Sequence, residues 1–143
     1  MSSGGSSKDD KNDKKTKKVL WRSDPQEHDY PAAESYLSLV GSPSEVDDLV
    51  ERLKQGTTQH YLAKDILRAA GLALLPADNP HVASDLRKIR KGEPLAPVLL
   101  VRGDFTRGAP AQIADGYHRV CASYLTDEDT DIPCRMVDPP KLG

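Results

Sequence analysis

The chain is poor in aromatic side chains and has no long hydrophobic run. Aromatic residues make up 5% of its 143 residues and hydrophobic residues 37%. That apolar share is below the globular average, so part of the chain is not expected to pack. The longest apolar stretches, such as Pro97–Val101, are too short to span a bilayer. No apolar segment follows the first lysines, which makes a secretory signal unexpected as well.

The sequence also lacks an excess of one charge and any cysteine framework. It has 20 Lys and Arg against 22 Asp and Glu, a net charge of −2. This excludes a strongly basic nucleic-acid binder as the default, although a local basic patch stays open. Cys121 and Cys134 form no CxxC or Cys/His pattern, which excludes a disulfide scaffold and a zinc site. We expect buried, inert thiols in a soluble cytoplasmic domain of bacterial type.

The two ends of the chain differ from its middle. Residues 1–18 hold six Lys, three Asp and a single apolar residue, the initiator Met1. A segment with nothing to bury cannot offset its ordering entropy, so 1–18 is predicted to be a disordered tail. This tail either keeps the protein soluble or acts as a basic arm. Such an arm would contact nucleic acid or an acidic partner. Trp21 is expected to anchor the first ordered segment, and residues 139–143 form a short C-terminal tail.

Residues 19–71 show helical periodicity and are predicted to be a helical extension. Apolar spacing within Pro31–Val40 predicts a first helix. Ser42 and Glu45 match a capping box, in which each side chain accepts a hydrogen bond from the other residue's backbone N–H. Pro43 at the first helical position strengthens this start of a second helix. A third helix is expected over Thr58–Ala70.

Residues 72–138 mix short apolar runs with one-sided helical patterns, which predicts a compact α+β domain. Leu72–Leu75 is read as either a strand or a packed loop entry. Asn79 and Pro80 resemble a helix cap and a first-turn proline, and Gly92 ends that helix. The remaining predicted elements are the strands Pro97–Val101, Ala111–Ala114 and Ile132–Val137 and the helix Tyr117–Leu125.

The most informative segment runs from Asp115 to Arg119, DGYHR in one-letter code. It places a strand end, a glycine turn and a helix start together, which directs backbone N–H groups and the helix dipole at one point. His118 and Arg119 add donors for an anion, and Arg suits phosphate. Asp115 at the mouth is suited to hold Mg²⁺ or to accept a proton from a hydroxyl. The alternative is that these residues have structural roles only. Asp115 would then cap the helix, Gly116 would form the turn, and His118 and Arg119 would be surface or packing groups.

This segment, with the apolar strand before it and Ile132–Cys134 after it, resembles the ParB/sulfiredoxin superfamily. The resemblance covers 72–138 and implies a small ParB/sulfiredoxin-like α+β domain that binds a nucleotide through the glycine turn and helix. ParB proteins bind cytidine triphosphate and DNA, sulfiredoxins use ATP, and related free-serine kinases phosphorylate an amino acid.

Several differences between this sequence and the members of the superfamily narrow the activity that the resemblance implies. Tyr117 stands where sulfiredoxins have a cysteine, and Cys121 lies one turn later, which disfavours sulfinic-acid repair. ParB proteins continue into a helix-turn-helix domain, for which no residues remain before Gly143, so a role in chromosome segregation is not expected. The serine kinases are closest, with an Asp-Gly-His-His-Arg segment. Asp78 lies near the place of their catalytic glutamate, although its plainer role is helix capping, as for His81.

The resemblance therefore implies a protein that binds a nucleoside triphosphate, ATP or CTP. It further implies phosphoryl transfer to a small hydroxyl substrate, or hydrolysis of the nucleotide. The expected phosphate ligands are Gly116, Tyr117, His118 and Arg119, with His81 as a further candidate. Asp115 would bind Mg²⁺ or act as the base, and Asp78 is the second catalytic candidate.

The competing hypothesis is a non-catalytic module that uses the same anion pocket. Its second surface would be the basic run Arg87–Lys91, which usually is a solvated helix face but can contact nucleic acid or a protein partner. Nucleic acid is not favoured, and no membrane partner is expected. The choice of nucleotide and the oligomeric state stay open.

Overall fold

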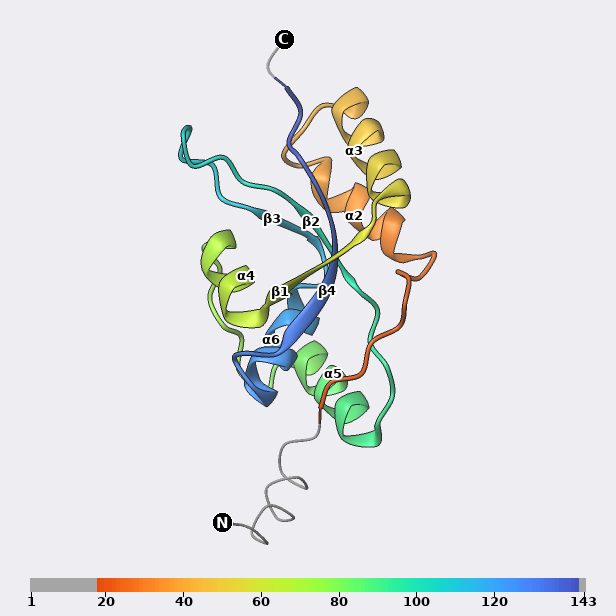
Figure 1. Ribbon diagram of the computed structural model, residues 1–143, viewed down its shortest axis with the longest axis vertical. Helices are drawn as coiled ribbons and strands as arrows, with labels where there is room; N and C mark the ends of the chain where they lie inside the picture. The colour runs from red at the N-terminus through yellow and green to blue at the C-terminus, as the bar shows by residue number, and fades with distance from the viewer. Residues whose placement is uncertain (1–17, 142–143) are drawn as a thin grey trace, which may run out of the picture.

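The computed structural model describes residues 18–141, so the predicted tail 1–18 lies outside the described residues apart from Lys18. Within this range, five helices and four strands form a small mixed α+β domain, as predicted (Figure 1). The helices are α2 (Asp29–Leu37), α3 (Pro43–Gln55), α4 (Ala63–Ala70), α5 (Pro80–Lys91) and α6 (Tyr117–Thr126). The strands are β1 (Thr58–Leu62), β2 (Val98–Val101), β3 (Gln112–Asp115) and β4 (Asp131–Val137). In this part of the chain, none of the helices is both long and apolar enough for a bilayer.

The four strands form one mixed sheet in the order β1-β4-β2-β3. Strand β4 pairs antiparallel with β1 and parallel with β2, while β2 pairs antiparallel with β3. All four residues of β2 are buried, as expected for an inner strand that is covered on both faces.

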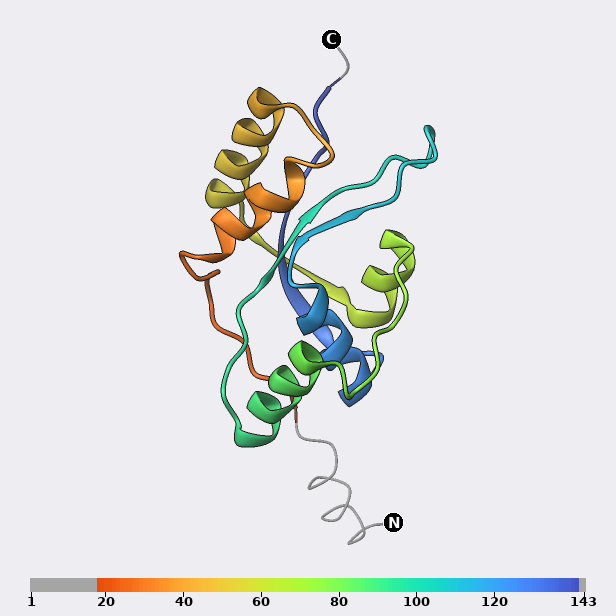
Figure 2. The same cartoon turned by 180° about the vertical axis from the view of Figure 1, so that it is seen from behind.

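Helices cover both faces of this sheet. One apolar cluster joins the sheet to α4, α5 and α6, and a second joins it to α2 and α3. Figures 1 and 2 show these two groups of helices on different sides of the sheet. Val98 and Leu100 of β2 belong to the first cluster, whereas Leu99 and Val101 belong to the second. This division follows from the pleat, because successive side chains of a strand point to opposite faces.

The predicted helix over Thr58–Ala70 is wrong in its first part. Thr58–Leu62 is the edge strand β1, whose residues pair with Arg135 through Asp131 of β4. Only Ala63–Ala70 is helical, and it ends at the left-handed Gly71. Segment 19–71 is therefore not wholly helical, because it supplies one strand of the same sheet. The paired residues of β1 and β4 lie 69 to 77 positions apart in the chain, where local periodicity carries no information.

The predicted starts of α3 and α5 are confirmed in atomic detail. Glu45 N donates to Ser42 Oγ at 3.3 Å, and Ser42 N donates to Glu45 Oε1 at 2.8 Å, which completes the capping box of α3. Asn79 Oδ1 accepts from the backbone N–H of His81 and of Val82 at the start of α5. These bonds satisfy amides that a helix leaves without internal partners.

Trp21 anchors the beginning of the described chain, as expected. It forms a parallel bridge with Leu95, and Arg22 N donates to Leu95 O at 2.8 Å. Its side chain packs on the apolar cluster beside α5. The two free cysteines, Cys121 and Cys134, are both buried, which confirms their expected placement.

Candidate functional site

The turn between β3 and α6 can be made only by glycine without strain. Gly116 has φ of +112°, and a Cβ added there would lie 2.9 Å from Val98 Cγ2. Both the backbone conformation and the contact therefore exclude a side chain. The close approach sets the start of α6 directly against strand β2.

The N-terminus of α6 has no side-chain cap. The first bond of the helix is donated by Val120 N to Gly116 O at 3.0 Å. The backbone N–H groups of Tyr117 and His118 precede this bond and so have no partner within the helix. They add to the positive end of the helix dipole, which favours an anion there.

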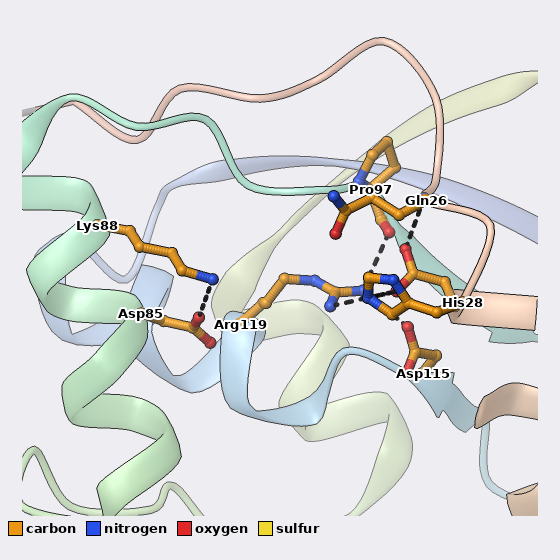
Figure 3. A network of polar contacts seen from close by, with 8 residues as sticks. Gln26, His28, Asp85, Lys88, Pro97, Asp115 and Arg119 are labelled. Carbon is orange, nitrogen blue, oxygen red and sulfur yellow. Dashed lines mark hydrogen bonds and ion pairs between the residues drawn. The ribbon is translucent and has the colours of Figure 1, made fainter.

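Arg119 is engaged within the protein and ties three elements together (Figure 3). Its Nη2 donates to Asp115 Oδ2 at 3.0 Å and to Pro97 O at 3.2 Å. Its Nη1 lies 4.0 Å from Asp29 Oδ1, at the start of α2. Among the described residues, its buried Nε has no hydrogen-bond partner. The guanidinium thus joins the end of β3, the entry to β2 and the first residue of α2.

Asp29 is the carboxylate of this network that the sequence did not indicate. Its side chain is 2% exposed, and its Oδ2 accepts from Gln26 N at 2.8 Å. His28 Nε2 lies 3.5 Å from its Oδ1. An aspartate in the first turn of a helix is a common capping choice, so no sequence signal linked Asp29 to Asp115, which lies 86 residues later.

Asp115 holds its proton more readily than an ordinary aspartate. Burial raises its pKa, the Arg119 cation opposes this, and the neighbouring Asp29 raises the pKa further. Two carboxylates that share one guanidinium in a poorly hydrated site compete for it, so the environment favours a proton on one of them. Such a carboxyl is suited to exchange a proton with a bound hydroxyl.

A pair of histidines borders the network on the side of α5. The rings of His81 and His118 have centroids 4.7 Å apart, and the Tyr117 ring stacks on His118 at 5.8 Å. Burial lowers the pKa of His118, and the nearby His81 lowers it further, against the opposing effect of Asp85. His118 is therefore disposed to be neutral near pH 7 and to gain charge when an anion binds.

Asp85 is a second site residue that the sequence analysis missed. It lies one turn after His81 on α5, its side chain is 13% exposed, and Lys88 Nζ is 4.0 Å away (Figure 3). Burial raises its pKa more than Lys88, Arg119, His118 and His81 together lower it. The spacing of His81 and Asp85 on one helix face was the available signal.

Tyr117 is used to hold the loop that precedes α5. Its hydroxyl donates to Ala73 O at 2.6 Å, and Leu75 N donates to Cys121 Sγ at 3.5 Å. Two alternatives were predicted for Leu72–Leu75, a strand and a packed loop entry. The structure confirms the packed loop entry.

Asp78 is exposed in the turn before Asn79. Within residues 18–141, no hydrogen bond or ion pair joins it to the other predicted site residues. The structure thus gathers Asp115, Gly116, Tyr117, His118, Arg119 and His81, and sets Asp78 apart.

Between Lys18 and Lys141, no group of three or more His, Cys, Asp or Glu side chains is arranged to hold a metal ion. A lone carboxylate such as Asp115 suits Mg²⁺ only when phosphate oxygens and waters complete the octahedron. Asp115 offers at most one such carboxylate, and its Oδ2 already accepts a hydrogen bond from Arg119 at 3.0 Å.

No family model, no curated protein and no solved structure matches this chain. The geometry of the site is therefore the basis for the functional conclusion.

Proposed function

We propose that the chain binds a nucleoside triphosphate, with the phosphates at the N-terminus of α6, as a domain of the ParB/sulfiredoxin type. The observation that carries the proposal is the glycine turn itself. Gly116 packs on Val98 and opens a helix with no side-chain cap, so the first amides of α6 are left for a ligand. Histidine rings from α5 and α6 flank this position and supply further donors.

Arg119 acts in this proposal by exchanging partners. Its Nη2 now holds Asp115 at 3.0 Å. A phosphate at the helix start competes for the same guanidinium, because a dianionic oxygen cluster attracts it more strongly than a single carboxylate whose pKa is raised by burial. Asp115 released in this way would either hold Mg²⁺ together with phosphate oxygens or act as the base.

The proposal extends to catalysis at the same site. Asp115, whose pKa is raised by burial, accepts the proton of a small hydroxyl substrate or of water. The γ-phosphoryl group then passes from the β-phosphate oxygen to that hydroxyl oxygen, and the nucleoside diphosphate leaves. Asp78 has no role in this scheme because it is exposed in a turn. Reduced thiols and a triphosphate ligand together favour a cytoplasmic location.

A second candidate function rests on the basic run of α5. Arg87, Lys88, Arg90 and Lys91 are exposed, so the run offers cations to a nucleic-acid backbone or an acidic partner. The acidic Asp85 on the same helix and the net charge of −2 make this candidate the weaker one.

Calorimetry with the full chain distinguishes nucleotide binding from binding to nucleic acid. ATP, CTP and GTP are titrated at millimolar concentration with and without Mg²⁺, and duplex DNA is titrated in parallel at two salt concentrations. The proposal expects saturable heat with at least one triphosphate. Heat only with DNA that falls steeply with salt supports the second candidate, and no heat in either series contradicts both.

A further inference from the structure

Histidine rings from two helices meet at the start of α6. His81 is the second residue of α5, and His118 is the second residue of α6. The two helices pack side by side (Figures 1 and 2), and the two ring centroids are 4.7 Å apart. The Tyr117 ring stacks on His118, and its phenol is uncharged near pH 7 because burial raises its pKa. His118 is half-buried and His81 is exposed, so a ligand can reach the pair from solvent.

The ring nitrogens of this pair are not committed to other protein groups. In the described part of the chain, no hydrogen bond joins a ring nitrogen of His81 or His118 to the protein. His60 differs, because its Nδ1 lies 2.6 Å from Asp131 Oδ2. All four nitrogens of the pair are therefore open to an incoming acceptor, and His60 provides a matched control.

The charged groups that face the rings do not hold a second proton on the pair. Burial lowers the pKa of His118 most, His81 and Arg119 lower it further, and Asp85 opposes them. Lys88 Nζ lies 4.0 Å from Asp85 Oδ1 and offsets part of the effect of that carboxylate. Two imidazolium cations at this separation also repel each other. Without a ligand, we expect the pair to be largely neutral at pH 7.5.

A phosphate on the first amides of α6 would lie next to these rings, because His118 carries both one of the amides and one of the rings. A negative charge there favours the protonated form of an imidazole. A terminal phosphate group carries nearly two charges at pH 7.5, since its second pKa is about 6. A phosphodiester carries only one charge. The terminal group therefore attracts a protonated ring more strongly.

We propose that His81 and His118 form a proton-coupled clamp for a terminal phosphate group. This inference rests on the proposed function and narrows its ligands to compounds that end in a phosphate monoester. When such a ligand binds, an imidazole nitrogen takes up a proton from the solvent and donates a hydrogen bond to a phosphate oxygen. No covalent bond forms or breaks. A phosphodiester, such as the backbone of nucleic acid, gains less from the clamp.

Calorimetry of the full chain in two buffers with different enthalpies of ionisation counts the protons taken up. ATP, CTP, GTP and inorganic tripolyphosphate are titrated at pH 7.5 without Mg²⁺, which would neutralise the terminal phosphate. We expect an uptake of about 0.5 to 1 proton per bound triphosphate. The affinity should then rise by up to about tenfold per unit of pH from pH 8 to pH 7. Trimetaphosphate, a ring without a terminal group, should bind more weakly and with less uptake.

Substitution of the rings assigns the protons to the clamp. His81→Gln and His118→Gln should each lower the uptake and weaken binding at least about threefold, because each removes one charge-assisted donor. The double variant should take up almost no proton. His60→Gln removes a histidine that is paired with Asp131 and should change neither quantity.

NMR titration of the histidine rings in the free protein tests the coupling without any nucleotide. The pKa of His118 should rise when His81→Gln removes the neighbouring ring, and it should fall further in Asp85→Asn. An unchanged His118 pKa in His81→Gln overturns the clamp, as does a proton uptake that the double variant retains. Triphosphate binding without proton uptake contradicts the clamp alone. A wild type that binds no triphosphate contradicts the proposed function and the clamp together.

Discussion

Arg119 and Asp115 form an ion pair at 3.0 Å in which neither side chain is more than 17% exposed. Asp115 ends β3 and Arg119 lies in the first turn of α6, so the pair spans the Gly116 turn. The same guanidinium stands 4.0 Å from the buried Asp29. One cation therefore faces both carboxylates that meet at this turn.

Arg119→Ala is expected to lower the free energy of unfolding by about 3 kcal/mol, because it leaves two buried carboxylates without their cation. Chemical denaturation at pH 7 measures the change. Arg68→Ala is the matched control, since Arg68 also pairs with an aspartate, Asp65, but is 85% exposed. Its loss should cost no more than about 0.5 kcal/mol. Equal effects of the two substitutions would contradict the internal role of Arg119.

Gly116→Ala is expected to be more harmful than a substitution at another left-handed glycine. Gly92 has φ of +75° with nothing within 4 Å of an added Cβ, so Gly92→Ala adds only backbone strain, about 1 kcal/mol. Gly116→Ala adds the clash with Val98 at 2.9 Å to that strain. The melting temperature should fall at least twice as far for Gly116→Ala. A fall no larger than that of Gly92→Ala would show that the contact with Val98 relaxes freely.

Much of the local structure could be predicted from sequence, because capping is a short-range interaction. The Ser42 box and the Asn79 cap need only three or four neighbouring residues, and both form as expected. Strand β1 could not be recognised, because Thr58–Leu62 becomes a strand only through its pairing with β4. Asp29 likewise joins the site only after α2 packs beside β3, a contact that no local pattern encodes.

Asp85 should make stability depend on pH on the acidic side of neutrality. Burial raises its pKa above 3.8, so the folded protein binds this proton more tightly than the unfolded chain. The free energy of unfolding therefore falls as pH rises through the interval between the two pKa values. Asp85→Asn removes that fall, and we expect its melting temperature to exceed the wild-type value at pH 7 by about 1 to 3 °C. The difference should shrink toward pH 3.5, and a variant that is less stable at pH 7 would contradict this account.

His118 should affect the pH dependence of stability in the opposite direction to Asp85. Its pKa is lowered from 6.5, chiefly by burial, so the unfolded chain binds this proton more tightly. The stability that neutral His118 contributes is present above pH 6.5 and is lost as pH falls through the lowered pKa. The wild type should lose more stability between pH 7.5 and pH 5.5 than His118→Gln does. Saturating triphosphate should reduce this loss, because a nearby anion favours the protonated ring. Identical pH profiles of wild type and His118→Gln would contradict the assignment.

Backbone amide NMR of the full ¹⁵N-labelled chain is the most direct test of the phosphate site. ATP, CTP and GTP are added with Mg²⁺ up to about 5 mM, well above the Kd expected of a physiological nucleotide site. The account predicts saturable shifts of the Tyr117 and His118 amides with at least one triphosphate, and much smaller shifts with the nucleoside alone. Shifts confined to residues 87–91, or no shift of the Tyr117 and His118 amides with any triphosphate, would contradict it.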